Sequence, residues 1–362
     1  MKVAFYAPLK HPGHPVPSGD RRVARLLLAA LAAGGHDAQV ASTLSSRDGR
    51  GEATAQAAIV DRAAAEAARL IAELAADRPA AWITYHLYYK APDLIGPAVA
   101  RALDLPYLVV EPSVAMKRAG GAWDLGHRAT LDALARADAV LCPTRYDIVG
   151  VWPHLRPDAL LYYLPPFLDR LPDAAARPGH GGRVRLLAVG MMRAGDKLGS
   201  YRQLAAALAL LPPGLDWRLT VVGDGPARPE VEQALAPLQS RIDWTGTVTA
   251  DELPGLYAAS DLYVWPGVGE AYGMATLEAQ AAGLAVVAGR QRGLPDVVAD
   301  GISARLVTPD DAQAFADAVA DLIADPEARV RLGAAGRARV AAERTVPAAA
   351  AILNRALAQV AR

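Results

Sequence analysis

Residues 262–283 read LYVWPGVGEAYGMATLEAQAAG and predict a buried strand that leads through a glycine-rich turn into a helix. The apolar run Leu262–Trp265 is typical of a parallel strand buried on both faces, and Pro266-Gly267 ends it. From Met274 to Ala282 the residues are mainly good helix formers, and Gly283 is a stop signal. Such a strand–helix unit is the building block of α/β folds with parallel sheets.

Two glutamates, Glu270 and Glu278, lie eight positions apart around the start of this helix. The first amides of a helix have no partner within it, so those of Gly273, Met274 and Ala275 suit a phosphate or a sugar hydroxyl. Carboxylates so near a phosphate are unfavourable unless they bind something else, and sugar hydroxyls are natural partners for them. The alternative is that both glutamates are ordinary surface charges. The whole segment favours a sugar-nucleotide site.

This segment resembles the Glu-x7-Glu signature of the family 4 retaining glycosyltransferases, which have the GT-B fold of two Rossmann-like domains facing an interdomain cleft. The resemblance implies that Glu278 binds the ribose hydroxyls of the donor nucleotide. It also implies that Glu270 binds hydroxyls of the transferred sugar, and that the backbone around Tyr272, Gly273 and Met274 contacts the sugar and the diphosphate.

The rest of the chain repeats the strand–helix alternation twice, which predicts two parallel sheets with right-handed crossovers. We expect an N-terminal Rossmann-like domain over 1–164, a proline- and glycine-rich linker over 165–182, and a C-terminal Rossmann-like domain over 183–346. The final segment, 347–362, predicts a helix that crosses back to the first domain, as the resemblance implies. The predicted strands are Val3–Ala7, Ala38–Ala41, Trp82–Tyr85, Tyr107–Val110, Val140–Cys142, Leu160–Leu164, Val184–Val189, Arg218–Val222, Ile242–Trp244, Leu262–Trp265, Ala285–Ala288 and Arg305–Val307.

Two cations follow the first strand of the second half. Arg193 and Lys197 lie four positions apart in a glycine-containing loop, where positive charge would neutralise a diphosphate leaving group. The family has an arginine and a lysine in these roles; the alternative is that both are surface charges. Gly223 and Asp224, in the turn after the next strand, resemble the family's nucleotide-side turn. The Gly-x-Pro-Glu-Val segment of the family has its counterpart near Asp296, where aspartate replaces glutamate.

The first half offers four further candidates. Gly19 and Asp20 precede the first helix, where relatives often carry two glycines that approach the donor phosphate; Asp20 is equally a candidate helix N-cap. His86 and Glu111 each end a strand and should border the interdomain cleft. Many relatives have a histidine at the place of Glu111. The carboxylate can accept a hydrogen bond or act as a base, and His86 can supply a donor; the alternative is a structural histidine at a strand end. The neighbouring pair Lys117-Arg118 can contact an anionic acceptor or membrane headgroups, although such a pair is usually solvated.

Composition is consistent with a large enzyme of two domains. The 362 residues carry 38 basic and 38 acidic side chains, so no overall charge attracts the chain to nucleic acid. Cys142 is the single cysteine, and its apolar surroundings indicate a buried side chain. The N-terminus does not resemble a signal peptide, and no run of eighteen apolar residues occurs. We therefore expect a cytoplasmic protein, with peripheral contact at the inner face of a membrane left open.

These observations predict a retaining glycosyltransferase that transfers a sugar from a nucleotide-sugar donor to a hydroxyl acceptor. No Asp-x-Asp occurs in the chain, which favours a reaction without a metal and without a further cofactor. Among relatives the donors are UDP- or GDP-linked, and the acceptors are glycans, lipid carriers or small metabolites. Two alternatives stay open: another enzyme on the same scaffold, such as an epimerase or a phosphorylase, and a catalytically silent sugar-nucleotide-binding subunit, which Asp20 and Glu111 suggest.

Overall fold

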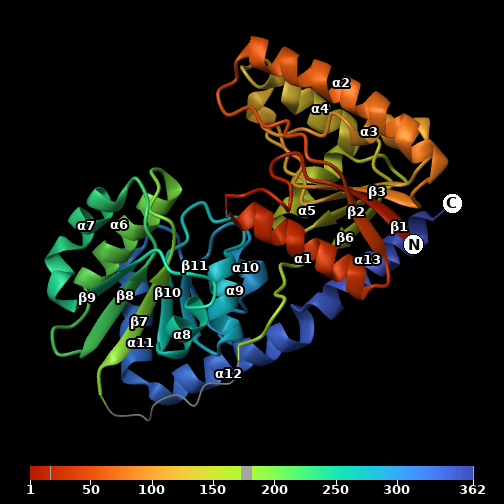
Figure 1. Ribbon diagram of the computed structural model, residues 1–362. Helices are drawn as coiled ribbons and strands as arrows, with labels where there is room; N and C mark the ends of the chain where they lie inside the picture. Colours follow the sequence, from red (N-terminus) through yellow and green to blue (C-terminus); the bar gives the residue numbers. More distant parts are fainter. Residues whose placement is uncertain (17, 173–181, 362) are drawn as a thin grey trace. The chain divides into compact units, whose positions relative to one another are not determined.

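The structure is a computed structural model that describes residues 1–16, 18–172 and 182–361 (Figure 1). Part of the predicted linker, 173–181, lies outside these residues. The chain forms two compact units, Met1–Pro165 with Val346–Arg362, and Pro166–Thr345. Leu168, in the described part of the predicted linker, packs in the core of the second unit. Each unit is described by itself.

The first unit is built on a six-stranded parallel sheet in the order β2-β1-β3-β4-β5-β6. Its strands are β1 (Lys2–Tyr6), β2 (Asp37–Ser42), β3 (Ala81–Tyr85), β4 (Tyr107–Val110), β5 (Ala139–Cys142) and β6 (Leu160–Tyr163). Every residue of β3, β4 and β5 is buried, as expected of strands covered on both faces. Cys142 lies in this core, and burial raises the pKa of its thiol.

The helices of the first unit are α1 (Gly19–Ala33), α2 (Ala53–Ala76), α3 (Gly96–Ala102), η1 (Met116–Arg118), α4 (Asp124–Leu134), α5 (Arg145–Val151), η2 (Trp152–His154) and α13 (Val346–Val360). Ser18 caps α1: its Oγ accepts a hydrogen bond from Arg21 N at 3.2 Å. The alternative that Asp20 is the N-cap is therefore wrong, because the extended residue before the helix is Ser18 and Asp20 lies in the first turn. The C-terminal α13 packs against α1, and Asn354 Nδ2 donates to Gly34 O at 3.2 Å.

The second unit has a six-stranded parallel sheet in the order β12-β11-β10-β7-β8-β9 (Figure 1). Its strands are β7 (Val184–Val189), β8 (Trp217–Val222), β9 (Ile242–Gly246), β10 (Leu262–Trp265), β11 (Ala285–Gly289) and β12 (Ala304–Val307). Its helices are α6 (Asp196–Ala209), α7 (Arg228–Leu235), η3 (Ala236–Arg241), α8 (Leu253–Ala258), α9 (Met274–Ala281), α10 (Leu294–Val297), α11 (Ala312–Ala324) and α12 (Pro326–Glu343). This strand order is that of a Rossmann fold.

Both predicted sheets are thus confirmed, and the α/β fold class with them. Each sheet has one point where the strand order reverses, between β1 and β3 in the first unit and between β7 and β10 in the second. In open parallel sheets, ligands bind at such switch points, beyond the carboxyl ends of the strands. Within the described ranges, no helix is long and apolar enough to cross a membrane.

Candidate active site

The strongest candidate site of the second unit lies at its switch point. Lys197, in the first turn of α6 after β7, and Glu270, in the loop after β10, meet with 2.5 Å between Nζ and Oε2. Trp265 Nε1 donates to the same oxygen at 3.2 Å, and the Lys197 ammonium lies 5.4 Å from the Trp265 ring centroid. The structure therefore brings together two predicted site residues that are 73 positions apart in the chain.

The loop that carries Glu270 is held on both sides. Val268 N donates to Ser200 Oγ of α6 at 2.9 Å, and Gly269 N donates to Gln291 Oε1 at 3.2 Å. Gly269 has a φ of 62°, and a Cβ there would come within 2.0 Å of the Asp196 carboxylate. A side chain at this position would strain the backbone and displace the Asp196 carboxylate, so glycine is favoured there. The loop is therefore fixed by its neighbours as well as by the Lys197 contact.

The start of α9 supplies the amides predicted for the donor. Gly273 is its N-cap, with a left-handed φ of 72°. Helix α9 begins at Met274, so the first amides of the helix, which have no helical partner, follow Gly273 directly. Tyr272 and Met274 are half-buried and pack against the core of the second unit. Glu270 lies in the loop between β10 and α9, so it precedes the helix N-terminus beyond the carboxyl end of β10.

Glu278 is oriented by a tyrosine of another helix. Tyr257 of α8 is 2% exposed, and its Oη donates to Glu278 Oε2 at 2.9 Å. The same hydroxyl lies 3.2 Å from Ala275 O, one turn earlier in α9. Glu278 itself is half-buried. The buried Tyr257 hydroxyl restricts the orientation of the partly exposed Glu278 carboxylate. A carboxylate held in this way can still accept hydrogen bonds from a pair of ligand hydroxyls.

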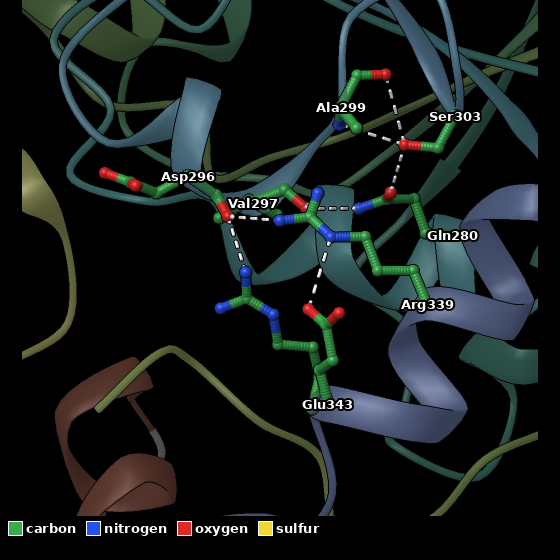
Figure 2. A network of polar contacts seen from close by, with 8 residues as sticks. Gln280, Asp296, Val297, Ala299, Ser303, Arg339 and Glu343 are labelled. Atoms are coloured by element: carbon green, nitrogen blue, oxygen red, sulfur yellow. Dashed lines mark hydrogen bonds and ion pairs between the residues drawn. The ribbon is translucent and has the colours of Figure 1, made fainter. Parts of the chain in front are cut away.

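Two residues after Glu278 in the chain, the buried side chain of Gln280 anchors α9 (Figure 2). Gln280 has no exposed surface; its Nε2 donates to Val297 O at 3.0 Å, and its Oε1 accepts from Ser303 Oγ at 3.0 Å. Ser303 Oγ also accepts from Ala299 N at 3.0 Å. Satisfied buried polar groups of this kind hold one arrangement of the elements that they join. The network thus links α9 to the segment that follows α10.

Arg339 of α12 and Arg344, directly after α12, bind the backbone of α10 (Figure 2). Arg344 is 2% exposed, and its Nη2 donates to Asp296 O at 2.7 Å. Arg339 Nη2 lies 3.4 Å from the same carbonyl, and its Nε is 3.4 Å from Glu343 Oε2. The Asp296 carboxylate points away from the Arg339 guanidinium in Figure 2, so these contacts use its carbonyl. Helix α10 is positioned through its backbone.

The other candidates of the second unit have different environments. Arg193 follows β7 and is exposed, and its guanidinium makes no ion pair within the described part of the chain. Asp224 Oδ2 lies 3.1 Å from Arg228 Nη1, and its Oδ1 accepts from Gly225 N. Gly223 N already donates to Gly246 O at 2.9 Å. The turn after β8 is therefore shaped by its own contacts.

In the first unit, three predicted polar side chains meet at the switch point. His86 follows β3 and Asp20 lies in the first turn of α1, with 3.1 Å between His86 Nδ1 and Asp20 Oδ1. Glu111 follows β4, and its Oε1 is 3.9 Å from the same nitrogen. His86 and Glu111 both have left-handed backbones, with φ of 61° and 55°. Such non-glycine residues are uncommon and cluster at functional sites. Gly19 opens α1 next to them.

Charge at this cluster is set mainly by the two carboxylates. Burial opposes a charge on His86, but the contact with Asp20 and the negative charges of Glu111 and Asp147 outweigh it and raise the pKa of His86 from its ordinary 6.5. Burial also opposes the ionised form of Asp20, yet the contact with His86 holds the pKa of Asp20 below its ordinary 3.8. Because its pKa is raised, His86 stays charged to higher pH than a free histidine.

Several residues that shape the site were not identified from the sequence. Tyr257, Ser200 and Gln291 orient Glu278 and the loop of Glu270. They come from three separate elements and carry no local motif, so only their position in space reveals them. Among the residues that the structure describes, no group of three histidine, cysteine or acidic side chains is placed to hold a metal ion.

Solved structures with the same fold show which class of protein this chain resembles. Sucrose-phosphate synthase from Thermosynechococcus elongatus has a TM-score of 0.76 and 21% identity to this chain, covering 99% of both chains. HepE from Anabaena, solved in complex with UDP, has a TM-score of 0.76 and 15% identity, covering 99% of this chain and 100% of HepE. The chain has the GT-B glycosyltransferase fold, of the family 4-like type.

Sequence comparison places the chain in a family. The description "Glycosyl transferases group 1" matches residues 183–325. An alpha-maltose-1-phosphate synthase of Mycobacterium tuberculosis is 30% identical over 286 residues, which cover 70% of this chain and 72% of the synthase. The chain therefore belongs to the group 1 glycosyl transferases.

A second relative is matched over less of its length. A GDP-mannose-dependent alpha-(1-6)-phosphatidylinositol monomannoside mannosyltransferase of Mycolicibacterium smegmatis is 33% identical over 217 residues, or 56% of this chain. The chain spans 57% of the length of this mannosyltransferase and 53% of its relative from Mycobacterium tuberculosis.

Proposed function

We propose that this chain is a retaining glycosyltransferase that transfers a sugar from a UDP- or GDP-linked donor to a hydroxyl acceptor. The observation that carries the proposal is the contact between Lys197 and Glu270 across the switch point of the second sheet, next to the glycine-capped start of α9. The donors that relatives use support it: one mannosyltransferase is GDP-mannose-dependent, and HepE was solved with UDP. A cytoplasmic location stays a prediction.

The residues fit the charge that develops during transfer. As the bond between sugar and phosphate breaks, negative charge grows on the diphosphate, and cations and helix amides aimed at it lower the barrier. Arg193 has no ion pair among the described residues, and it is the first candidate for the diphosphate. Glu270 holds Lys197 beside the start of α9, and we assign the sugar hydroxyls to Glu270 and the ribose hydroxyls to Glu278. With these cations, the reaction is proposed to need no metal ion.

The proposal is tested by nucleotide binding. Wild type is expected to gain thermal stability with UDP or GDP, because a ligand that binds only the folded chain stabilises it. Glu278→Ala removes the two charge-assisted hydrogen bonds that we propose to the ribose, each of which contributes on the order of 1.5–3 kcal/mol, so the nucleotide affinity should fall about a hundredfold or more. The measurement is the melting temperature against nucleotide concentration, and the base that gives the larger shift identifies the donor.

Glu230→Ala is the matched control. Glu230 is exposed on α7, and its side chain makes no hydrogen bond or ion pair with the described residues, so its removal should leave the nucleotide shift unchanged. Absence of a shift with every nucleotide in wild type would sink the transferase proposal. Saturable nucleotide binding without any transfer or donor hydrolysis would instead favour the silent binding subunit.

Stability should also depend on pH through His86. Because the pKa of His86 is raised in the folded chain, the stabilisation from its charge is fully present below the unfolded pKa, about 6.5, and is lost as the pH rises through the folded pKa. Asp20, whose pKa is lowered, stays ionised throughout this window. His86→Asn removes the charge and tolerates the left-handed backbone. The melting-temperature difference between wild type and His86→Asn is therefore expected to be larger near pH 6 than near pH 9.

His154→Asn serves as the control, because His154 makes no ion pair among the residues that are described. The melting-temperature difference between wild type and His154→Asn should be similar near pH 6 and near pH 9. If the melting-temperature difference between wild type and His86→Asn does not change with pH, the pairing of His86 with Asp20 is contradicted.

A further inference from the structure

A cluster of cations and aromatic rings lies beside the His86 site in the first unit, and no assigned role uses it. Lys90 belongs to the loop after β3, and Arg118 ends η1 after β4. Both cover the same two rings: Lys90 Nζ is 5.1 Å from the Trp123 centroid and 5.9 Å from that of Tyr89, and Arg118 Cζ is 5.1 Å and 5.0 Å from them. Two separate loops thus bring two positive charges to one place.

These two charges are only partly balanced by acidic side chains. Neither Lys90 nor Arg118 forms an ion pair with any residue of the described segments, and Arg118 Nε is buried without a hydrogen-bond partner. The negative charge of Asp48 acts on Lys90 without a direct ion pair, and the Asp48 carboxylate is held by Gly51 N at 2.9 Å and Gln56 Nε2 at 2.7 Å. The rings offset part of the repulsion between two neighbouring cations, and an anion would offset the rest.

The cluster is continuous with the candidate site of the first unit. The rings of His86 and Tyr88 have centroids 5.0 Å apart, those of Tyr88 and Tyr89 are 5.5 Å apart, and Tyr89 meets Trp123 edge-on at 5.9 Å. A molecule held by its anionic group at the cluster therefore has aromatic surface leading to His86. The flat rings suit the apolar face of a sugar or polyol, and the guanidinium beside them suits a phosphate.

We propose that Lys90 and Arg118 form an anion subsite for the acceptor, and that this acceptor carries a phosphate monoester or diester. The proposal rests on the transferase function proposed above and narrows its acceptor from any hydroxyl compound to a phosphorylated one. Arg118 provides a planar pair of donors for two phosphate oxygens, Lys90 provides a point charge, and the Tyr89 and Trp123 rings cover the carbon skeleton. The same chemistry is offered by a soluble phosphate ester and by a lipid headgroup.

The experiment uses two probes, glycerol 3-phosphate for a soluble ester and vesicles of phosphatidylcholine with added phosphatidylglycerol for a lipid. Binding is measured for wild type, Lys90→Gln and Arg118→Gln by calorimetry and by vesicle sedimentation. At least one probe should bind wild type, and each variant should bind it about tenfold more weakly, because a hydrogen bond to a charged group is lost. If the two variants lose binding to the vesicles alone, the ligand is a lipid headgroup. If they lose binding to glycerol 3-phosphate alone, the ligand is a free ester.

Arg128→Gln is the matched control, since it removes the same charge from an exposed arginine that pairs with Asp124 on α4. It should bind both probes as wild type does. Equal binding by wild type and both variants, or binding of neither probe, would overturn the subsite. The nucleotide-dependent melting shift is measured in the same variants: if it persists while probe binding does not respond, the subsite fails and the transferase proposal stands. Absence of the nucleotide shift in wild type is the separate failure of the transferase proposal.

Discussion

Replacing Glu270 by glutamine is expected to lower kcat by about a hundredfold to a thousandfold, the usual effect of removing one group that stabilises the transition state. Glu270 Oε2 lies 2.5 Å from Lys197 Nζ and accepts from Trp265 Nε1, so the carboxylate holds the cation, and we propose that it also binds the sugar. Glutamine keeps the shape but loses the charge that fixes Lys197. The measurement is kcat and KM for the donor, once the base is known from the nucleotide screen.

A double-mutant cycle measures how much the contact between Lys197 and Glu270 contributes beyond the two residues taken singly. Because Lys197 and Glu270 act as a unit in this arrangement, Lys197→Met together with Glu270→Gln should lose little more activity than either change alone. Glu230→Ala, on the exposed face of α7, should keep wild-type kcat. A Glu270→Gln enzyme within a few fold of wild type would refute the role given to this contact. Losses that multiply in the double variant would show that the two residues act independently.

The second large effect is on stability, at Gly223. Gly223 has a φ of 131°, and a Cβ there would approach Gly190 O to 2.0 Å, a backbone atom that cannot move aside. Gly190 N in turn donates to Val222 O at 3.0 Å, so the loops after β7 and β8 are locked together. Gly223→Ala is expected to lower the free energy of unfolding of the second unit by about 3 kcal/mol or more, from strain and overpacking together.

Gly214→Ala is the control for Gly223→Ala. Gly214 lies in a turn of the same unit, and a Cβ there would meet no described atom within 4 Å. This variant should unfold at nearly the wild-type urea concentration. Unfolding is followed by circular dichroism in urea, with the midpoint and slope compared between variants. Equal midpoints for Gly223→Ala and Gly214→Ala would show that the two loops are not in close backbone contact.

The strands were predictable because parallel strands buried on both faces have to be apolar throughout. Apolar runs such as Leu262–Trp265 and Tyr107–Val110 stand out in the sequence, and the structure has a fully buried strand at each. The N-cap of α1 was harder, because Ser18 and Asp20 are both residues that cap helices. The choice depends on which of them has the extended backbone, and the structure assigns it to Ser18.

In the candidate site, too, some residues were predictable from the sequence and others were found only in the structure. Glu270, Glu278 and Lys197 were predicted from local motifs that resemble those of the family, and their charges suit sugar hydroxyls and a diphosphate. Their partners were not: Tyr257 orients Glu278 from another helix, and no local pattern marks a tyrosine for that task. The Asp20 contact with His86 likewise joins two segments that follow different strands.

The sequence by itself determined the α/β class, the positions of the strands and the residue types available for a sugar-nucleotide site, because periodicity, helix signals and side-chain chemistry are local properties. The order of the strands and the pairing of charges were decided only by the tertiary structure. Strand order places the ends of β7 and β10 side by side and so lets Lys197 reach Glu270. Contacts between residues 73 positions apart depend on how the whole chain packs, and no short stretch of sequence contains that information.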